Sequence, residues 1–406
     1  MKNLVKFEFR KIWTKLTLIS VTSLIVVSTI LTIIGYYSID SAVNSKGEEV
    51  KGIKAFRVIK NESKNMKGLM DQDYLDKLVE DFNSSKEKLN FEDRLGLWLT
   101  RFDVSNHIIN YANYGKESFN IYMGLDFNFL KSEKDFYNQY KKTVKDNILF
   151  DNQQLWFKYS DKNIEKINEK VDNIKTPFNV DYYEGINNLM WQFSEQFLFV
   201  PLVIVFSLSS FFSKDSNNGI DELTLSSKYG RKKNMNARII SGNIFTVVVY
   251  AIFIATLLIE HQLMGSLQGW NQSIQNIFHT CIYNISLGTG VLIMICQGLL
   301  TTLLVANLVM FVSIKIKYSK LATLLALGGV GILERLTYTD NSLQLQLNPM
   351  YFSTSLYAGS PSVFNIFYFI GDAMIPYIVA FPILVLLYIV IISVLTKREY
   401  KKYRLN

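Results

Sequence analysis

Apolar residues are collected into long blocks along the chain. The first block, Leu16–Tyr37, has no Lys, Arg, Asp or Glu over 22 positions, and as an α-helix it would measure about 33 Å at ~1.5 Å per residue. A bilayer's hydrocarbon core is about 30 Å thick, so this block predicts a membrane-spanning helix. Similar blocks follow at Leu189–Phe212, Ile239–Leu263, Asn284–Ile314, Leu321–Leu333 and Met374–Thr396. The pattern predicts six transmembrane helices, although the short, Gly-rich fifth block fits either a full span or part of one.

Outside the long segment 38–188, nearly all Lys and Arg residues lie in four short segments: the N-terminus, the connections after the second and fourth blocks, and the C-terminus. By contrast, Met264–His279 and Leu336–Gly371 contain neither residue. Short cytoplasmic loops of membrane proteins are enriched in Lys and Arg, so both termini are expected in the cytoplasm, which requires an even number of spans. The net charge of +8 then reflects topology and contact with membrane lipid. Because the basic residues are scattered, no nucleic-acid partner is expected.

The predicted spans divide the chain into three parts. Residues 1–37 hold an amphipathic N-terminal segment and the first span, residues 38–188 form an extracellular domain, and residues 189–406 hold the other five spans. With 49% hydrophobic and only 19% charged residues, the chain does not fit a soluble enzyme or a disordered protein. We therefore expect a polytopic α-helical membrane protein.

The extracellular domain is expected to be mostly helical with some strand. Apolar residues have helical spacing in Tyr74–Leu89, Phe136–Phe150 and Asn163–Ile174, whereas Lys51–Ile59 has the pattern of a strand. The domain contains no cysteine, so disulfides do not stabilise it. Its many aromatic residues fit an ordinary core better than a surface that captures an amphiphilic ligand.

The most informative polar stretch is Phe211–Arg238, with the sequence FFSKDSNNGIDELTLSSKYGRKKNMNAR. Asn218 suits a helix N-cap, and the acidic residues that follow it complement the helix dipole in the first turn. Gly230 suits a left-handed stop. A short amphipathic helix is therefore predicted over Gly219–Tyr229, on the cytoplasmic side of the membrane. Its apolar face would carry Ile220, Leu223 and Tyr229.

In this stretch the chain resembles the ABC-2 type permeases, the membrane subunits of ATP-binding-cassette exporters. That family has an aromatic residue, an acidic residue three positions on, a Gly, a Leu-rich helix and a Gly-Arg pair. The matching residues here are Phe212, Asp215, Gly219, Leu223, Leu225, Gly230 and Arg231. Asp215 stands where the family usually has Glu, which keeps the charge. The resemblance covers most of the chain, because the N-terminal KFEFRKIW segment, the large outside domain, the five further spans and the polar stretch around Pro349 also fit.

The resemblance implies that the loop at about 214–231 is a coupling helix that docks on a separate ATPase subunit. The residues expected at that contact are Phe212, Asp215, Gly219, Ile220, Glu222, Leu223, Gly230 and Arg231. Two ATPase copies, which bind ATP and Mg, and a second permease, identical or homologous, complete the expected complex. The exported substrate is expected to be an amphiphilic peptide or a lipid-like compound, with sodium or drug efflux as other possibilities. A helix that only lies on the membrane surface is the simpler alternative for the loop.

The sequence contains no pattern for catalysis or for a bound cofactor. There is no Walker A sequence, so ATP is expected on the partner chain, and neither an HExxH zinc motif nor a G-x-S-x-G elbow occurs. We therefore expect a transport subunit that is not an enzyme and that binds no metal. Cys281 and Cys296 would lie about 22 Å apart on one helix, too far for a disulfide, and are expected to be packing residues.

Polar residues inside the predicted spans are further candidates, since their burial in lipid is costly. The candidates to line a translocation path or a subunit interface are Glu195, Gln196, Asn243, Asn284, Gln297 and Asn307, and Glu195, Gln297 and Asn307 are the ones selected for a path. For the Asn and Gln residues, hydrogen bonding between neighbouring helices is the favoured alternative, and for Glu195 structural pairing is an equal one. Glu260 and His261 are expected at the outer end of a span, where water or headgroups solvate them.

Two other functions remain open. A non-transporting membrane receptor or sensor would use the extracellular domain to bind a ligand and the cytoplasmic loop to dock a signalling protein. A polytopic membrane enzyme fits less well, because the catalytic patterns are missing. Richness in Lys, Asn and Ile is typical of AT-rich bacterial genomes, so a multi-pass protein of the bacterial cell membrane is expected.

Overall fold

The computed structural model describes residues 1–38, 41–84, 97–101, 108–109, 111–112, 131–154, 159–213, 233–316, 318–338, 347–354, 363–370 and 373–402. The α-helices are α1 (Lys2–Ile12), α2 (Lys15–Ser38), α3 (Ile53–Glu62), α4 (Gln72–Ser84), α7 (Glu133–Gln154), α8 (Asp161–Asp172), α9 (Glu184–Gln196), α10 (Phe199–Leu208), α13 (Met235–Met264), α14 (Leu287–Lys315), α15 (Ser319–Arg335), α17 (Tyr351–Thr354) and α18 (Tyr377–Lys402). The 3₁₀ helices are η1 (Ser63–Asn65), η5 (Ile274–Asn276), η6 (Leu336–Tyr338) and η7 (Val363–Asn365). The strands form antiparallel pairs, which are β1 (Ser41–Val43) with β2 (Glu49–Lys51), β3 (Gly68–Leu69) with β4 (Asn179–Val180), and β5 (Phe367–Ile370) with β6 (Ala373–Pro376).

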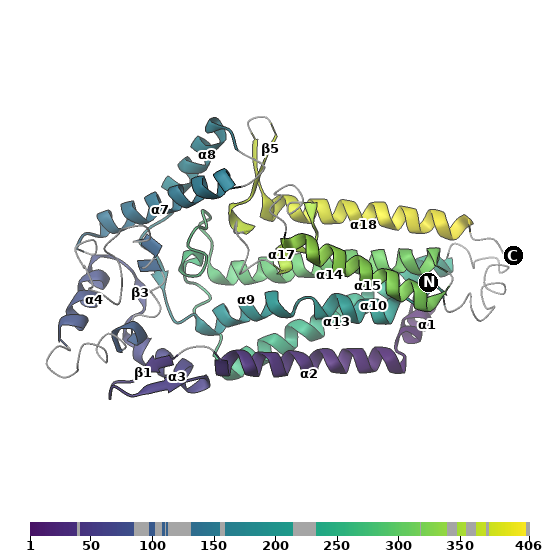
Figure 1. Cartoon of the computed structure of the whole chain (residues 1–406), viewed down its shortest axis with the longest axis horizontal. Coiled ribbons are helices and arrows are strands. Elements are labelled where there is room, and N and C mark those ends of the chain that lie inside the picture. The colour runs from purple at the N-terminus through teal and green to yellow at the C-terminus, as the bar shows by residue number, and fades with distance from the viewer. Residues whose placement is uncertain are drawn as a thin grey trace.

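The molecule is elongated, with a helical bundle joined end-on to a smaller domain (Figure 1). Helices α2, α9, α10, α13, α14, α15 and α18 run along the long axis, and α14 contacts four of the others: α10, α13, α15 and α18. The domain helices α3, α4, α7 and α8 gather beyond one end of the bundle. Helix α1 and the last turns of α18 lie at the opposite end. The domain and the two ends of the chain are therefore separated by the length of the bundle.

Four helices, α2, α13, α14 and α18, are long and apolar enough to cross a membrane. The pair α9 and α10 adds a fifth span if these two helices, bent by 42°, cross as one. The bend has a physical cause, because Pro201 has no N–H to donate to the carbonyl of Phe197. Helix α15 has only 17 residues, fewer than the roughly 20 that a span needs. The chain is thus built as a helical membrane protein, while the count of six spans stays a prediction.

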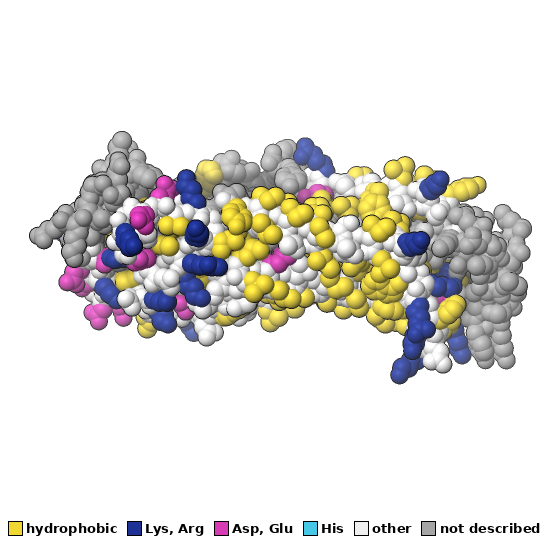
Figure 2. Space-filling view, turned by 90° about the horizontal axis from the view of Figure 1, so that it is seen from below, with side chains coloured by type: hydrophobic (Ala, Val, Ile, Leu, Met, Phe, Trp, Pro, Cys, Tyr) yellow, Lys and Arg dark blue, Asp and Glu magenta, His cyan; other side chains and the backbone are white. Residues whose placement is uncertain are grey.

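Exposed side chains on the bundle are mainly apolar. On α18 they include Ile383, Leu386, Leu387, Val390 and Val394. In the most apolar 18-residue stretch of α18 only 11% is buried inside the protein, whereas in that of α14 56% is buried. Helix α14 is therefore central in the bundle and α18 is peripheral. Figure 2 shows apolar side chains over the bundle, with basic and acidic side chains gathered toward the two ends of the molecule. Such an outward apolar surface fits an environment of lipid.

The domain between α2 and α9 contains the helices that apolar spacing predicted. Helices α4, α7 and α8 lie over the described parts of the three predicted segments. The prediction of a strand at Lys51–Ile59 is wrong, because the chain forms α3 after Gly52. Ala55, Phe56 and Ile59 are buried on one face of α3, which is a helical repeat that the β-branched composition of the segment conceals.

Aromatic residues of the domain that the structure describes are mostly core residues. Tyr137 and Tyr140 on α7 both pack edge-on against Phe178, with ring centroids 5.2 Å and 5.1 Å away. Trp98 is also buried and donates from its indole N–H to the carbonyl of Leu78. These contacts support the prediction of an ordinary core.

The domain meets the bundle where backbones approach closely. Tyr182 donates a hydrogen bond of 2.6 Å to the carbonyl of Gly265 at the end of α13. A Cβ at Gly185, in the first turn of α9, would lie 2.2 Å from the carbonyl oxygen of Ser266. Lys60 on α3 donates to the hydroxyl of Ser266 at 2.9 Å. Only a glycine at position 185 therefore allows α9, the end of α13 and α3 to meet in this way.

The variant Gly185→Ala is expected to lower the free energy of unfolding by about 1–3 kcal/mol, because its methyl group overlaps a backbone oxygen. The matched control is Gly329→Ala in α15, where no atom lies within 4 Å of an added Cβ. That variant should be neutral or stabilising by up to about 1 kcal/mol. Thermal unfolding in detergent measures both. Equal melting temperatures for the two variants would contradict the close approach.

The connection between α13 and α14 packs against the domain, on β4 and α7. Ser273 donates from its backbone N–H to the carbonyl of Asn179, and the amide of Asn276 donates to the same oxygen. Tyr140 donates to the carbonyl of His279 at 2.6 Å. Cys281 is fully buried beneath these contacts, and burial raises the pKa of its thiol to about 12. This connection is therefore a packed part of the domain, and Cys281 is one of its packing residues, as predicted. The same prediction is wrong for Cys296, which is exposed on α14.

In a Cys296→Ala background, Cys281 should react with a water-soluble maleimide at pH 7.5 only after the protein is unfolded. An ordinary cysteine has a pKa of about 8.5, so the unfolded chain carries reactive thiolate at that pH. In the folded chain the thiolate forms only as the pH rises toward about 12. The mass shift with and without denaturant measures the reaction, and Ser45→Cys in a cysteine-free chain is the exposed control. Labelling of folded Cys281 at the control's rate would contradict its burial.

Candidate functional site

A column of hydrogen-bonded polar side chains runs between α2 and α9 inside the bundle. Gln196 on α9 is at its centre and is fully buried. Its carbonyl oxygen accepts from Ser28 at 2.6 Å, and its amide donates to Thr32 at 3.2 Å and to Gln192 at 2.6 Å. Ser28 with Thr32, and Gln192 with Gln196, are each four residues apart, so each pair shares one face of its helix. All four side chains are buried, so their hydrogen bonds to one another replace those that water would make at the surface.

Glu260 on α13 joins this region from a third helix. The hydroxyl of Thr29 donates to one carboxylate oxygen of Glu260, and the other oxygen is buried with no hydrogen bond. The side chain of Glu260 is 7% exposed, and no ion pair to it is found among the residues that the structure describes. The expectation that water or headgroups solvate Glu260 is therefore wrong in this structure, because α2 covers it.

His261, the next residue, is also buried and not solvated. Its Nδ1 lies 2.8 Å from the carbonyl of Leu257, and its ring lies 5.4 Å from the ring of Tyr36. Tyr36 in turn packs against Phe56 of α3 at 4.7 Å. The end of α13 that carries Glu260 is thus linked to α3 of the domain through the rings of His261, Tyr36 and Phe56.

The three residues predicted to line a translocation path do not meet in this structure. Glu195 is exposed on α9, next to the buried Gln196. Gln297 donates to the carbonyl of Ile378 on α18 at 2.9 Å. Asn307 donates to the side chain of Asn243 on α13 at 2.9 Å. The two amides therefore act between neighbouring helices, which was the alternative role, and each contacts a different helix.

Sequence reasoning missed Ser28, Thr32 and Gln192, which bond to Gln196, and it missed Thr29, which bonds to Glu260. A usable signal was present, because the hydroxyl residues of the first span and the two glutamines each recur at helical spacing. Polar residues on one face of an apolar helix point to a shared interface.

At the opposite end of the bundle, both ends of the predicted coupling loop are anchored. Phe212 lies just before the loop and is buried. Its backbone N–H donates to Ser313 of α14 at 3.0 Å, and its ring packs against Tyr400 of α18 at 6.1 Å. The other predicted contact residues, Asp215, Gly219, Ile220, Glu222, Leu223, Gly230 and Arg231, lie outside the described residues. Phe212 therefore ties the start of the loop to two helices.

Arg238 in the first turn of α13 anchors the end of the loop. Its guanidinium carbon lies 5.4 Å from the centre of the Phe212 ring and 5.8 Å from that of Phe211. Its Nε lies 3.3 Å from a carboxylate oxygen of Glu8 on α1, and both side chains are 2% exposed. Lys11 also donates to Glu8 at 3.3 Å. One buried arginine thus connects the loop with α1.

Further contacts hold α1 against α13. Ser241 donates from its hydroxyl to the carbonyl of Val5 at 2.8 Å. Trp13, directly after α1, packs edge-on against Phe245 at 5.4 Å. The N-terminal segment is therefore a fixed part of the bundle end in this structure, and its buried ion pair is its most costly contact to break.

Arg238→Gln should lower the free energy of unfolding by about 3–5 kcal/mol, because the buried Glu8 carboxylate loses its buried partner and keeps, among the described residues, only the partly exposed Lys11. The double variant Glu8→Leu with Arg238→Met replaces the pair with apolar side chains and should recover most of that loss. Lys145→Gln is the control, since it removes a pair with Asp172, which is 60% exposed, and should cost less than about 1 kcal/mol. Unfolding in detergent measures all three. Equal losses for Arg238→Gln and Lys145→Gln would show that the Glu8 pair is not buried.

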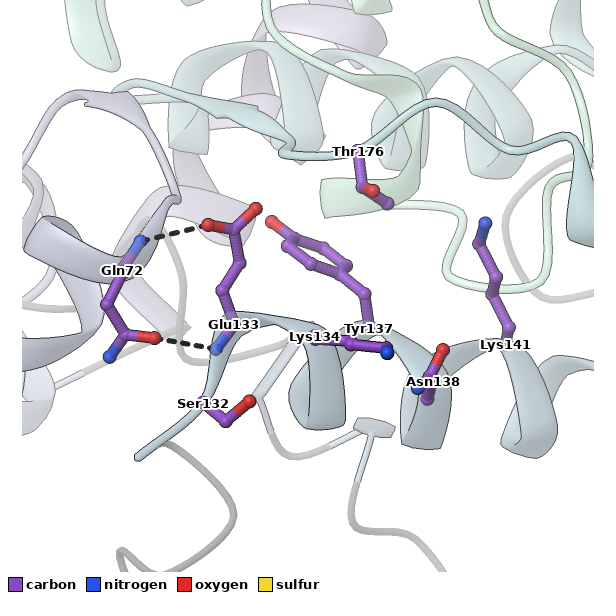
Figure 3. A pocket seen from close by; sticks show the side chains of 8 residues that line it. All are labelled: Gln72, Ser132, Glu133, Lys134, Tyr137, Asn138, Lys141 and Thr176. Atoms are coloured by element: carbon purple, nitrogen blue, oxygen red, sulfur yellow. Dashed lines mark hydrogen bonds between the residues drawn. The ribbon is translucent and has the colours of Figure 1, made fainter.

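The domain carries an open polar pocket of about 520 Å³. Figure 3 shows Lys134, Asn138 and Lys141 along α7, with Thr176 on the facing segment. Gln72 and Glu133 close one side through two reciprocal hydrogen bonds of 3.2 Å and 2.8 Å. The pocket's size and polar lining suit a small polar ligand.

The side chains around this pocket have structural partners of their own. Tyr137 donates to the carbonyl of Met70 at 2.8 Å and accepts from the N–H of Phe178, and burial raises the pKa of its phenol. Lys141 donates to the carbonyl of Asp172 at 2.7 Å, and partial desolvation lowers its pKa. In the described part of the chain, no cluster of His, Cys, Asp or Glu is placed to hold a metal ion. The side chains that line the pocket can therefore bind a small polar ligand, and no catalytic group is evident among them.

No known protein family, no curated protein and no solved structure matches this chain.

Proposed function

We propose that this chain is the transmembrane permease subunit of an ABC exporter of the ABC-2 type. In this proposal the N-terminus, the loop between Ser213 and Lys233, and the end of α18 face the cytoplasm of a bacterium, and the domain faces outward. Their placement at opposite ends of the bundle supports this topology. Two permeases would work with two ATPase subunits that bind ATP and Mg.

The observation that carries the proposal is the anchoring of the loop at both ends. Phe212 and Arg238 stack on each other, and together they contact α1, α14 and α18. A coupling loop must pass a displacement from an ATPase to several spans at once. A loop whose two ends share one packed cluster meets this requirement, because a movement of either end moves the same helices.

The same proposal gives the polar column a role in transport. Helix α13 begins at the loop anchor with Arg238 and carries Glu260 near its other end, where Thr29 is its only hydrogen-bond partner among the described residues. Displacement of α13 against α2 would change this contact. An amphiphilic peptide or a lipid-like compound fits such a path best, because it needs both polar groups and an apolar surface.

A receptor or sensor is the second candidate, and the domain pocket is the observation that favours it. A pocket of about 520 Å³ with basic and amide side chains is large enough for a small polar ligand. In that case a ligand would bind the isolated membrane protein without any ATPase partner. The experiment below separates the two functions.

The chain, purified from its native membrane in mild detergent, should bring down an ATPase with a Walker A sequence at close to one-to-one stoichiometry. Gly219→Asp with Leu223→Asp should abolish the substrate-stimulated part of the ATP hydrolysis, since charges would disrupt an apolar contact, while membrane insertion stays unchanged. Lys46→Asp, in the β1–β2 turn at the far end of the molecule, is the control and should keep the stimulation. Absence of any ATPase in several detergents would sink the exporter proposal and leave the receptor as the better one.

A further inference from the structure

The surface of the bundle has an apolar groove of about 240 Å³ between α2 and α10. Ile19, Ser23 and Val27 line it from α2, and Phe199, Leu202 and Phe206 line it from α10. The groove begins where the α9–α10 pair bends by 42°, so the change of direction of α10 leaves this space beside α2. None of the residues predicted for transport lies in it.

The groove is about as long as one leaflet of the membrane core is thick. From Ile19 to Val27 it follows α2 for about 12 Å at ~1.5 Å per residue, close to the depth of one leaflet of a core about 30 Å thick. Ile19 on α2 is 62% exposed and Phe206 on α10 is 37% exposed, so apolar side chains of both helices are accessible to a chain that lies in the groove. Burial of apolar area there adds packing contacts that loose lipid lacks.

A positive charge lies at the end of the groove nearest the end of the bundle. Lys15, Ile19, Ser23 and Val27 follow one another at intervals of four residues, so they form one row on α2. Lys15 is exposed and has no ion pair among the described residues. Lys6 and Arg10, on the exposed face of α1, add further basic charge at this end of the bundle. An apolar slot with a cationic end is complementary to an anionic amphiphile.

We propose that this groove binds one acyl chain of an anionic phospholipid whose headgroup is held by Lys15. The lipid would occupy the leaflet on the side of α1, and it would fill the space between α2 and α10. This site does not depend on the transport function, because a receptor with the same bundle would carry it as well.

Native mass spectrometry of the full chain tests the proposal, with phosphatidylglycerol and phosphatidylcholine of identical acyl chains as probes. Phosphatidylglycerol should bind more tightly than phosphatidylcholine. The substitution Lys15→Gln should lower the affinity for phosphatidylglycerol by about fivefold and leave the affinity for phosphatidylcholine unchanged. Lys320→Gln, an exposed lysine at the same end of the bundle on α15, is the matched control and should change neither. Ser23→Phe, which fills the groove from an exposed position, should weaken both lipids.

Several outcomes overturn the site. Equal affinity of the two lipids for the unaltered chain removes the role of the headgroup. Unchanged binding in both Ser23→Phe and Phe206→Ala removes the groove. If Ser23→Phe instead reduces self-association of the chain and leaves lipid binding intact, the occupant is a second copy of the chain and the lipid proposal is wrong. Melting temperatures of each variant confirm that the loss of binding is not a loss of fold.

Discussion

The bundle depends on one constraint, which is that polar groups inside an apolar surface must find their partners within the protein. Gln196 meets this constraint with three partners on two helices. Because its oxygen accepts from Ser28 and its amide donates to Thr32, these two bonds favour one rotation of α2 relative to α9. That rotation turns Thr29 toward Glu260 and Tyr36 toward His261. This rotation of α2 therefore helps to position α13, and it helps to position the domain helix α3, which packs against Tyr36 through Phe56.

Helix α13 links the two ends of this arrangement. Arg238 and Glu260 are 22 residues apart on it, a distance of about 33 Å along a straight helix. At one end the helix is bound to α1 and to the loop through a buried ion pair, and at the other it ends in Gly265, where the domain approaches. A single continuous helix therefore joins the loop anchor to the contact between Glu260 and Thr29. This connection is a property of the fold and holds for any partner.

Apolar blocks were enough to predict the four long helices α2, α13, α14 and α18 and their positions, because an apolar run of this length leaves a strong mark on composition. The same signals could not give the partners of polar side chains. Ser28 bonds to a residue 168 positions away, and Thr29 to one 231 positions away, and no local pattern encodes such pairs. Glu195 and Gln196 show the limit most clearly, because two adjacent polar residues differ only in the direction they face. At Lys51–Ile59 the β-branched composition was misleading, since burial against Tyr36 decided for a helix.

Helix α2 serves two environments along its length, and this division organises the outer face of the bundle. Its second half, from Ser28 to Tyr36, faces α9 with hydroxyl groups, whereas its first half faces α10 with Ile19 and Val27 around an open groove. The change falls where α9 gives way to α10, and Pro201 causes the bend at that level. A straight helix in place of this pair would pack along all of α2 and close the groove. The proline at the bend between α9 and α10 therefore also helps to form the groove proposed to hold a lipid chain.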